Sequence, residues 1–292
     1  NDYSIGIEDV LKEHFDEENI VYWMAFQILM GNVDTQNRNV YLYSPLNSDI
    51  WYFIAWDNDG CLMRPEYELR NFSDQNSWEK GISNYWGNIL FQRCLKSRSF
   101  REKLNDAILD LREYLNKDML TSKIESYKNV LKPYLYLMPD AEYEPLTSEQ
   151  YDQIAASLPD EIEKNYQLYL ESLETPMPFY IGVPTIDGDK LKFNWDVSYD
   201  LDAEDITYFV EVARDYLFRD VIYQNTTLTV PEAEMDLPEA GQYFVRVRAT
   251  NTSGKTQDAF DYYVTDEGKH YGMKCFYITE DNTVEEDIYE EG

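Results

Sequence analysis

The most informative residues of this chain are Gly31-Asn32-Val33-Asp34-Thr35-Gln36-Asn37-Arg38-Asn39 and, further on, Trp56-Asp57-Asn58-Asp59-Gly60. In the first run, an Asp stands five positions before an Asn. Two short predicted strands then lead to the second run, where a further Asp follows a Trp. The spacing therefore places carboxylate and amide side chains on both sides of one hairpin.

This order of side chains fits the chemistry of phosphoryl transfer. Protein kinases place a catalytic base and two metal ligands in the same order. A phosphoryl group bound to Mg²⁺ needs hard oxygen donors on the metal and a separate carboxylate directed at the attacking hydroxyl. In this interpretation Asp34 is the catalytic base, and Asn39 and Asp57 hold the metal. Asp59 is a second or spare metal ligand.

The flanking residues support this layout. Residues 18–30 are apolar on most faces, which predicts a helix buried on several sides, with Asp16 as its N-cap. Residues 40–43 and 51–54 read as two strands joined by a turn. The predicted local order is helix, loop, hairpin and Asp.

The same residues allow one other interpretation, and their spacing excludes a second. Asn and Asp are common in turns because their side chains bond nearby backbone, so both runs are also compatible with ordinary surface turns. An EF-hand calcium loop at residues 57–60 is excluded by its spacing, because Gly60 directly follows Asp59 instead of following a third ligand.

Residues 31–34, 37–43 and 51–59 together resemble the CotH-like spore-coat kinases, a divergent branch of the protein-kinase-like fold found in secreted and spore-surface proteins. The resemblance implies that Asp34 is the catalytic carboxylate, that Asp57 holds the metal and that Asn39 supports it. The family more often has Asp-Leu-Asp or Asp-Ile-Asp after the Trp. Asn58 departs from that pattern and leaves both carboxylates in place.

The resemblance covers about residues 1–170 and only the large lobe of the family. It implies ATP with Mg²⁺ or Mn²⁺ as cofactors and Ser or Thr hydroxyls of extracellular or surface proteins as substrates. A kinase also needs a small lobe with a phosphate-covering loop and a Lys. Because only 33 residues precede Asp34, we expect this chain to be a fragment or processed product that is inactive alone. The alternative is a non-catalytic surface or scaffold protein.

The remainder of the first predicted domain, residues 1–174, supplies packing. Helical spacing of apolar residues predicts further helices within residues 89–115, 124–131 and 149–173. Residues 67–86 are polar and irregular, which indicates either an activation or substrate loop or a plain surface loop. No residue identifies a nucleotide-binding contact.

After a linker at residues 175–178, the apolar pattern changes from helical to alternating, and residues 179–265 hold about seven short strands. This stretch resembles fibronectin type III domains. The resemblance implies that Trp195 is the core Trp and that the Tyr243 hydroxyl bonds back to the chain. The predicted fold class is therefore multi-domain α+β: a mostly helical kinase-like large lobe with a short hairpin, followed by an all-β sandwich that acts as a spacer or docking module.

The formal net charge of −31 is the main compositional constraint. A field of this sign repels nucleic acid and anionic membranes and favours cations and basic partners. Solubility is the more usual explanation of such a charge. Residues 280–291 contain seven acidic side chains. We therefore predict that residues 266–292 form an acidic C-terminal extension.

Cysteine and histidine contribute little chemistry. Cys61, Cys94 and Cys275 are an odd number without metal-ligand spacing, and the chain has two His residues. Cys61 is interpreted as core packing and not as a nucleophile. No stretch reaches the ~20 apolar residues of a membrane span. Low cysteine content is compatible with a secreted bacterial protein, and the resemblance to a fibronectin module implies a secreted or cell-surface location.

Overall fold

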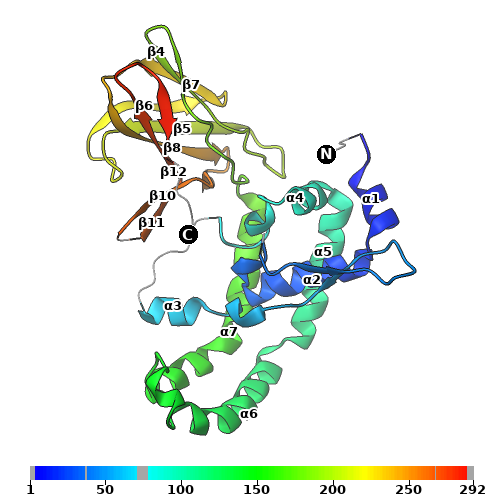
Figure 1. Ribbon diagram of the computed structural model, residues 1–292. Helices are drawn as coiled ribbons and strands as arrows, with labels where there is room; N and C mark the ends of the chain where they lie inside the picture. The colour runs from blue at the N-terminus through cyan, green and yellow to red at the C-terminus, as the bar shows by residue number, and fades with distance from the viewer. Residues whose placement is uncertain (1–3, 37, 71–77, 267, 288–292) are drawn as a thin grey trace. The chain divides into compact units, whose positions relative to one another are not determined.

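The computed structural model describes residues 4–36, 38–70, 78–266 and 268–287. The chain forms two compact units, one of residues 1–73 with 80–171 and one of residues 74–79 with 172–292. The first unit is mostly helical, and the second is built of antiparallel strands (Figure 1). The predicted mixed α+β class is confirmed.

The first unit contains seven described α-helices, four short 3₁₀ turns and one hairpin. The helices are α1 (Ile7–His14), α2 (Glu17–Met30), α3 (Arg64–Arg70), α4 (Ile89–Lys96), α5 (Arg98–Tyr114), α6 (Lys117–Leu135) and α7 (Ser148–Glu174). The 3₁₀ turns are η1 (Val33–Gln36), η2 (Asn58–Gly60), η3 (Ser83–Tyr85) and η4 (Asp140–Glu142). The hairpin consists of β1 (Tyr41–Tyr43) and β2 (Tyr52–Ile54).

Helix α2 is the central element of this unit. It begins after Asp16, whose Oδ1 accepts a hydrogen bond from the Asn19 N–H at 2.9 Å, so the predicted helix and its N-cap are confirmed. The helix is apolar around its circumference and buries Ile20, Val21, Trp23, Met24, Ala25, Gln27, Ile28 and Leu29. A helix of this composition needs neighbours on every side, and α5, η3 and β2 pack against it.

The hairpin is attached to α2 through Asn19. Its Nδ2 donates to the Phe53 carbonyl at 3.1 Å, and its Oδ1 accepts from the Phe53 N–H at 2.6 Å. Tyr41 pairs with Ile54 and Tyr43 with Tyr52, which confirms the two predicted strands. The outer strand β1 is exposed along its whole length. Only Phe53 is buried among the strand residues of this hairpin.

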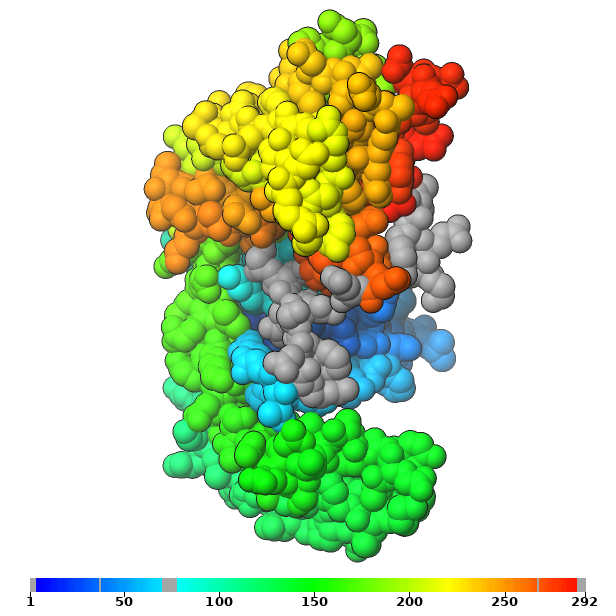
Figure 2. Space-filling view, turned by 90° about the vertical axis from the view of Figure 1, so that its left-hand side faces the viewer, coloured from blue at the N-terminus to red at the C-terminus, as the bar shows by residue number. Residues whose placement is uncertain are grey.

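Helices α6 and α7 form a helical hairpin whose far end projects from the rest of the first unit (Figures 1 and 2). One face of α6 is apolar and exposed, with Tyr127, Val130, Leu131 and Tyr134 each more than half accessible. The opposite face is held to α7 by Lys132, whose Nζ lies 2.5 Å from Asp152 Oδ2. No described helix is long and apolar enough to cross a bilayer.

The second unit contains two antiparallel sheets and a separate two-stranded hairpin. Its strands are β3 (Thr185–Asp187), β4 (Lys190–Asn194), β5 (Ile206–Ala213), β6 (Val221–Leu228), β7 (Glu232–Asp236), β8 (Gly241–Asn251), β9 (Thr256–Asp258), β10 (Tyr262–Thr265), β11 (Gly268–Tyr271), β12 (Met273–Ile278) and β13 (Val284–Glu286). One sheet has the order β13-β12-β8-β5-β6 with β9 beside β8, the other has the order β3-β4-β7, and β10 pairs with β11. Both sheets contribute to one apolar core.

Trp195 and Tyr243 occupy the kinds of position that the sequence suggested. The Trp195 side chain is buried beside Tyr208, with ring centroids 5.4 Å apart. The Tyr243 hydroxyl donates to the Glu239 carbonyl at 2.7 Å, four residues back along the chain. These contacts describe a two-sheet core; the fibronectin type III identity of the unit stays a prediction.

The sheet continues beyond residue 265, where the sequence predicted an extension. Strand β12 pairs with β8 from Met273 to Ile278, and β13 then pairs with β12. Met273, Cys275, Phe276 and Ile278 are buried, so this short apolar run is core. The acidic residues that follow this run made the whole segment resemble a solvent-exposed extension in the sequence. Of the predicted polar loop at residues 67–86, residues 71–77 lie outside the described residues, and Trp78 is buried against Phe260 within the second unit.

We predict that Tyr243→Phe lowers the free energy of unfolding of the second unit by about 1 kcal/mol, because the hydrogen bond from the buried Tyr243 side chain to the Glu239 carbonyl is lost. Urea unfolding of the whole chain measures this effect. Tyr143→Phe, at a side chain that is 81% exposed, is the matched control. Equal stability of the two variants would show that the hydroxyl contributes nothing.

Candidate functional site

Asp34 lies in η1, immediately after the C-terminus of α2. The helix ends at Gly31, which has the left-handed conformation (φ 61°) that favours glycine at this position. Asn32 is buried, and Asp34 is exposed. The end of a rigid helix therefore places the Asp34 carboxylate at the surface of the first unit.

The last four carbonyl groups of a helix have no partner within it. In α2 all four are hydrogen-bonded. The carbonyls of Gln27 and Ile28 accept from the N–H groups of Asn32 (3.0 Å) and Gly31 (3.1 Å). The Leu29 carbonyl accepts from Asn165 Nδ2 on α7 at 2.8 Å, and the Met30 carbonyl accepts from the Leu62 N–H at 2.8 Å. The end of α2 is thus fixed by α7 and by the segment that follows Asp59.

A cluster of three amides links the Asp34 turn to η2. Asn58 Oδ1 accepts from Gln27 Nε2 at 3.1 Å and from Asn32 Nδ2 at 3.4 Å, and Asn32 Nδ2 also lies 3.0 Å from Gln27 Oε1. Gln27 and Asn32 are almost fully buried. Asn58, the residue that departs from the family pattern, is therefore an anchor between the two turns.

Below η1, Thr35 and Tyr85 form a second set of buried contacts. The Thr35 hydroxyl donates to the Asn32 carbonyl and lies 3.0 Å from the Tyr85 hydroxyl. Asn84 Nδ2 donates to the Val33 carbonyl at 3.2 Å. Burial raises the pKa of Tyr85 above its usual value, so this hydroxyl stays protonated and acts as a structural support.

The two predicted runs meet at Gly60. A Cβ at this position would lie 2.9 Å from Asn32 Oδ1 and 3.3 Å from Asp34 Oδ2. The Asp34 carboxylate therefore lies against η2, which contains Asp59 and directly follows Asp57. Asn32 Oδ1 is a buried oxygen without a geometrically satisfactory hydrogen-bond partner among the described atoms. The structure thus brings Asp34 to the turn that carries the predicted metal ligands.

Asn39 and Asp57 lie at the same end of the hairpin, because Tyr41 pairs with Ile54. Both have left-handed backbone conformations, with φ of 54° and 51°, and Leu62 has a φ of 57°. Residues other than glycine adopt this conformation at a cost, and such residues concentrate at functional sites. Among the described residues, no hydrogen bond joins the Asn39 side chain to Asp34, so their proximity stays a prediction.

The donor set suits a metal ion that retains water and phosphate ligands. Asp34, Asp57 and Asp59 are exposed, and their carboxylates make no hydrogen bond or ion pair with a described residue. Within the described ranges, no three His, Cys, Asp or Glu side chains are grouped to hold a metal. Mg²⁺ is commonly bound by one or two carboxylates plus substrate phosphates, so this arrangement fits Mg²⁺ better than an ion that needs an all-protein cage.

Cys61 follows η2 and is half-buried. Burial, together with the neighbouring Asp59 charge, raises the pKa of its thiol to about 12. The thiol is therefore protonated at neutral pH. The structure supports the interpretation of Cys61 as a packing residue.

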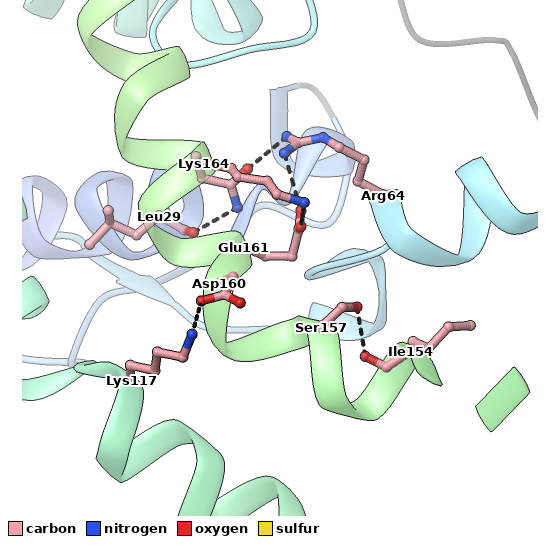
Figure 3. Close-up of polar contacts among 9 residues, drawn as sticks. Leu29, Arg64, Lys117, Ile154, Ser157, Asp160, Glu161 and Lys164 are labelled. Carbon is pink, nitrogen blue, oxygen red and sulfur yellow. Dashed lines mark hydrogen bonds and ion pairs between the residues drawn. The ribbon is translucent and has the colours of Figure 1, made fainter. Parts of the chain in front are cut away.

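The sequence did not predict the residues outside the two turns that bind the turns through hydrogen bonds. Figure 3 shows Arg64, at the start of α3, directed at Glu161 on α7. Arg64 also donates to Asn165 Oδ1 at 2.7 Å. One feature of the sequence could have indicated them. Glu161 and Asn165 are polar and lie four residues apart in a predicted helix, beside its apolar positions Leu158 and Ile162.

One comparison with known proteins bears on the first unit. Residues 1–169 match the family model described as CotH kinase protein. The chain belongs to the CotH kinase family. No curated protein matches this CotH-family chain significantly. Among solved structures, it is similar to the "Twitchin kinase region from C.elegans (Fn31-NL-kin-CRD-Ig26)", at 15% identity and a TM-score of 0.24, over 32% of this chain and 20% of that one.

We predict that Gly60→Ala destabilises the first unit by about 1–3 kcal/mol, because the new methyl group would press on Asn32 and Asp34. Thermal unfolding of the whole chain measures the change. Gly6→Ala, where a Cβ would have only ordinary contacts of 3.6 Å or more, is the control. Equal melting of Gly60→Ala and the parent would indicate that the two turns are not in contact.

Proposed function

We propose that this CotH-family chain is the large-lobe part of a kinase-like phosphotransferase that moves the γ-phosphoryl group of ATP to Ser or Thr hydroxyls. The observation that carries the proposal is the contact at Gly60, where the Asp34 carboxylate lies against the turn of Asp57 and Asp59. Kinases use this combination, a carboxylate for the acceptor hydroxyl beside carboxylates for the metal.

Asp34 would orient the acceptor hydroxyl and take its proton, since it is exposed and no described hydrogen bond occupies its carboxylate. Asp57 and Asp59, with the Asn39 amide oxygen, would hold Mg²⁺ or Mn²⁺. The bound metal would neutralise phosphate charge. The rigid end of α2 and the amides of Gln27 and Asn32 would keep the two turns in register.

The proposal includes a small lobe supplied from outside residues 1–292, because a phosphate-covering loop and its Lys contribute much of nucleotide positioning and charge neutralisation. It also includes a secreted or surface location on a bacterial cell, where the second unit, with its buried Trp195 and the Tyr243 contact, serves as a fibronectin-like spacer or docking module. The net charge of −31 opposes binding of free ATP by this chain alone.

One observation favours a second function, a non-catalytic binding platform. The hairpin beside the site exposes aromatic side chains, with Tyr41, Tyr43 and Trp56 each at least 52% accessible. Exposed aromatic patches are typical of protein-binding surfaces. In this alternative the hairpin binds a protein partner, and Asp34 has no chemical role.

We predict that Asp57→Asn melts like the parent protein but loses the stabilisation that Mg²⁺ or Mn²⁺ gives, because a neutral amide replaces a hard anionic ligand. Thermal shift over a metal titration measures both properties. Asp49→Asn, at an exposed position in the turn of the same hairpin, controls for the charge change. Metal protection that is equal in all three proteins would remove Asp57 from the site.

We predict further that residues 1–292 alone transfer no measurable phosphate, and that a longer protein carrying the small lobe is active and loses its activity in Asp34→Ala. Labelled ATP, Mn²⁺ or Mg²⁺ and a hydroxyl-rich protein acceptor test both statements. Asp34-dependent labelling by residues 1–292 would show that the nucleotide site is complete without a small lobe. A longer protein that binds partners but never labels them would favour the platform.

A further inference from the structure

We infer that Arg64, Glu161 and Asn165 are positioning residues that fix the Asp34 turn and the Asp57–Asp59 turn relative to one another. The inference rests on the proposed function for its catalytic meaning. The structural part of the inference is that α7 holds the two turns together. This part can be tested without an activity assay.

The first contact joins α7 to the Asp34 turn. Asn165 Nδ2 donates to the Leu29 carbonyl at 2.8 Å, and Asn165 is 4% exposed. A Cβ at Gly31 would lie 2.7 Å from the same Nδ2, so the amide also packs directly against the residue that ends α2. Loss of this amide would leave a buried helix carbonyl without a donor.

The second contact joins α7 to the segment after Asp59. Arg64 extends two nitrogens to α7: one to Asn165 Oδ1 at 2.7 Å and one to Glu161 Oε2 at 3.1 Å. The Glu161 side chain is 1% exposed, and Lys164 Nζ lies 2.5 Å from its other carboxylate oxygen (Figure 3). A planar guanidinium can bridge two acceptors at fixed geometry, whereas an ammonium group cannot reproduce that fork.

Asn165 is therefore shared between the two turns. Its nitrogen holds the turn before Asp34, and its oxygen holds Arg64, which lies five residues after Asp59. The backbone hydrogen bond from the Leu62 N–H to the Met30 carbonyl also joins the end of α2 to the segment after Asp59. One side chain on a long helix thus sets the spacing between the proposed base and the proposed metal ligands.

The test uses the whole chain with Asn165→Leu and Arg64→Met. We expect amide hydrogen exchange at Leu62 and Asn32 to accelerate by about tenfold or more in both variants. The Leu62 bond joins the two turns and the Asn32 bond closes the end of α2, and both should open more often. We also expect the dissociation constant for Mn²⁺ to rise by about fivefold or more in the folded variants. Arg64→Lys should behave like Arg64→Met, since it keeps the charge without the fork.

Two controls separate positioning from general loss of stability. Lys117→Met breaks the exposed ion pair with Asp160, which lies on α7 next to Glu161 (Figure 3). Leu104→Ala removes a fully buried side chain from α5 in the same unit. In both controls, amide exchange at Leu62 and Asn32 should change by no more than exchange elsewhere in the first unit. The Mn²⁺ dissociation constant should stay unchanged.

The outcomes distinguish the two proposals. A parent chain that binds no Mn²⁺ would contradict the proposed function, and the exchange measurement would then decide the coupling alone. Local exchange at Leu62 and Asn32 that matches the controls would overturn the inference. Selective exchange with an unchanged Mn²⁺ dissociation constant in a metal-binding parent would also overturn it, because the turns would then be loosened without effect on the site.

Discussion

The structure of the first unit depends on one requirement, that the C-terminus of α2 be buried with every carbonyl satisfied. The helix is apolar on most sides and lies in the core, so most of its last turn is shielded from water. The partners come from three directions: the turn itself, Leu62 after η2, and Asn165 on α7. Because the candidate site follows this helix end, the same hydrogen bonds that permit burial also locate Asp34.

Some parts of the candidate site could be predicted because the residues that determine them are close together in the sequence. Asp16 is a capping residue before an apolar helix, and two strands flank a turn, so the helix and hairpin follow from residue type and spacing. The bridge formed by Arg64 and Asn165 could not be predicted, since 101 residues separate its ends and neither belongs to a motif. Asn58 appeared to be only a departure from a pattern, and its role became apparent through Gln27, 31 residues away.

The second unit shows the same division between local and distant information. Alternation of apolar residues identified the longer strands, including the run that became β8. It failed at β12, where six residues pair with the middle of the sheet although acidic residues follow closely. Acidic residues near a segment indicate only that part of it faces solvent. Phe276 and Ile278 are nevertheless buried, because their burial depends on the residues that pack against them in the sheet.

The hydrogen bond between Asn165 and Leu29 joins residues 136 positions apart, and this separation constrains the order of events during synthesis. When α2 leaves the ribosome, the donor for one of its terminal carbonyls has not yet been made. A nascent chain that stops before α7 exposes an apolar helix whose end is incompletely bonded, a state in which chaperones bind and aggregation begins. The hydrogen bonds that complete the end of α2, beside the Asp34 turn, can therefore form only after nearly the whole of the first unit has been synthesised.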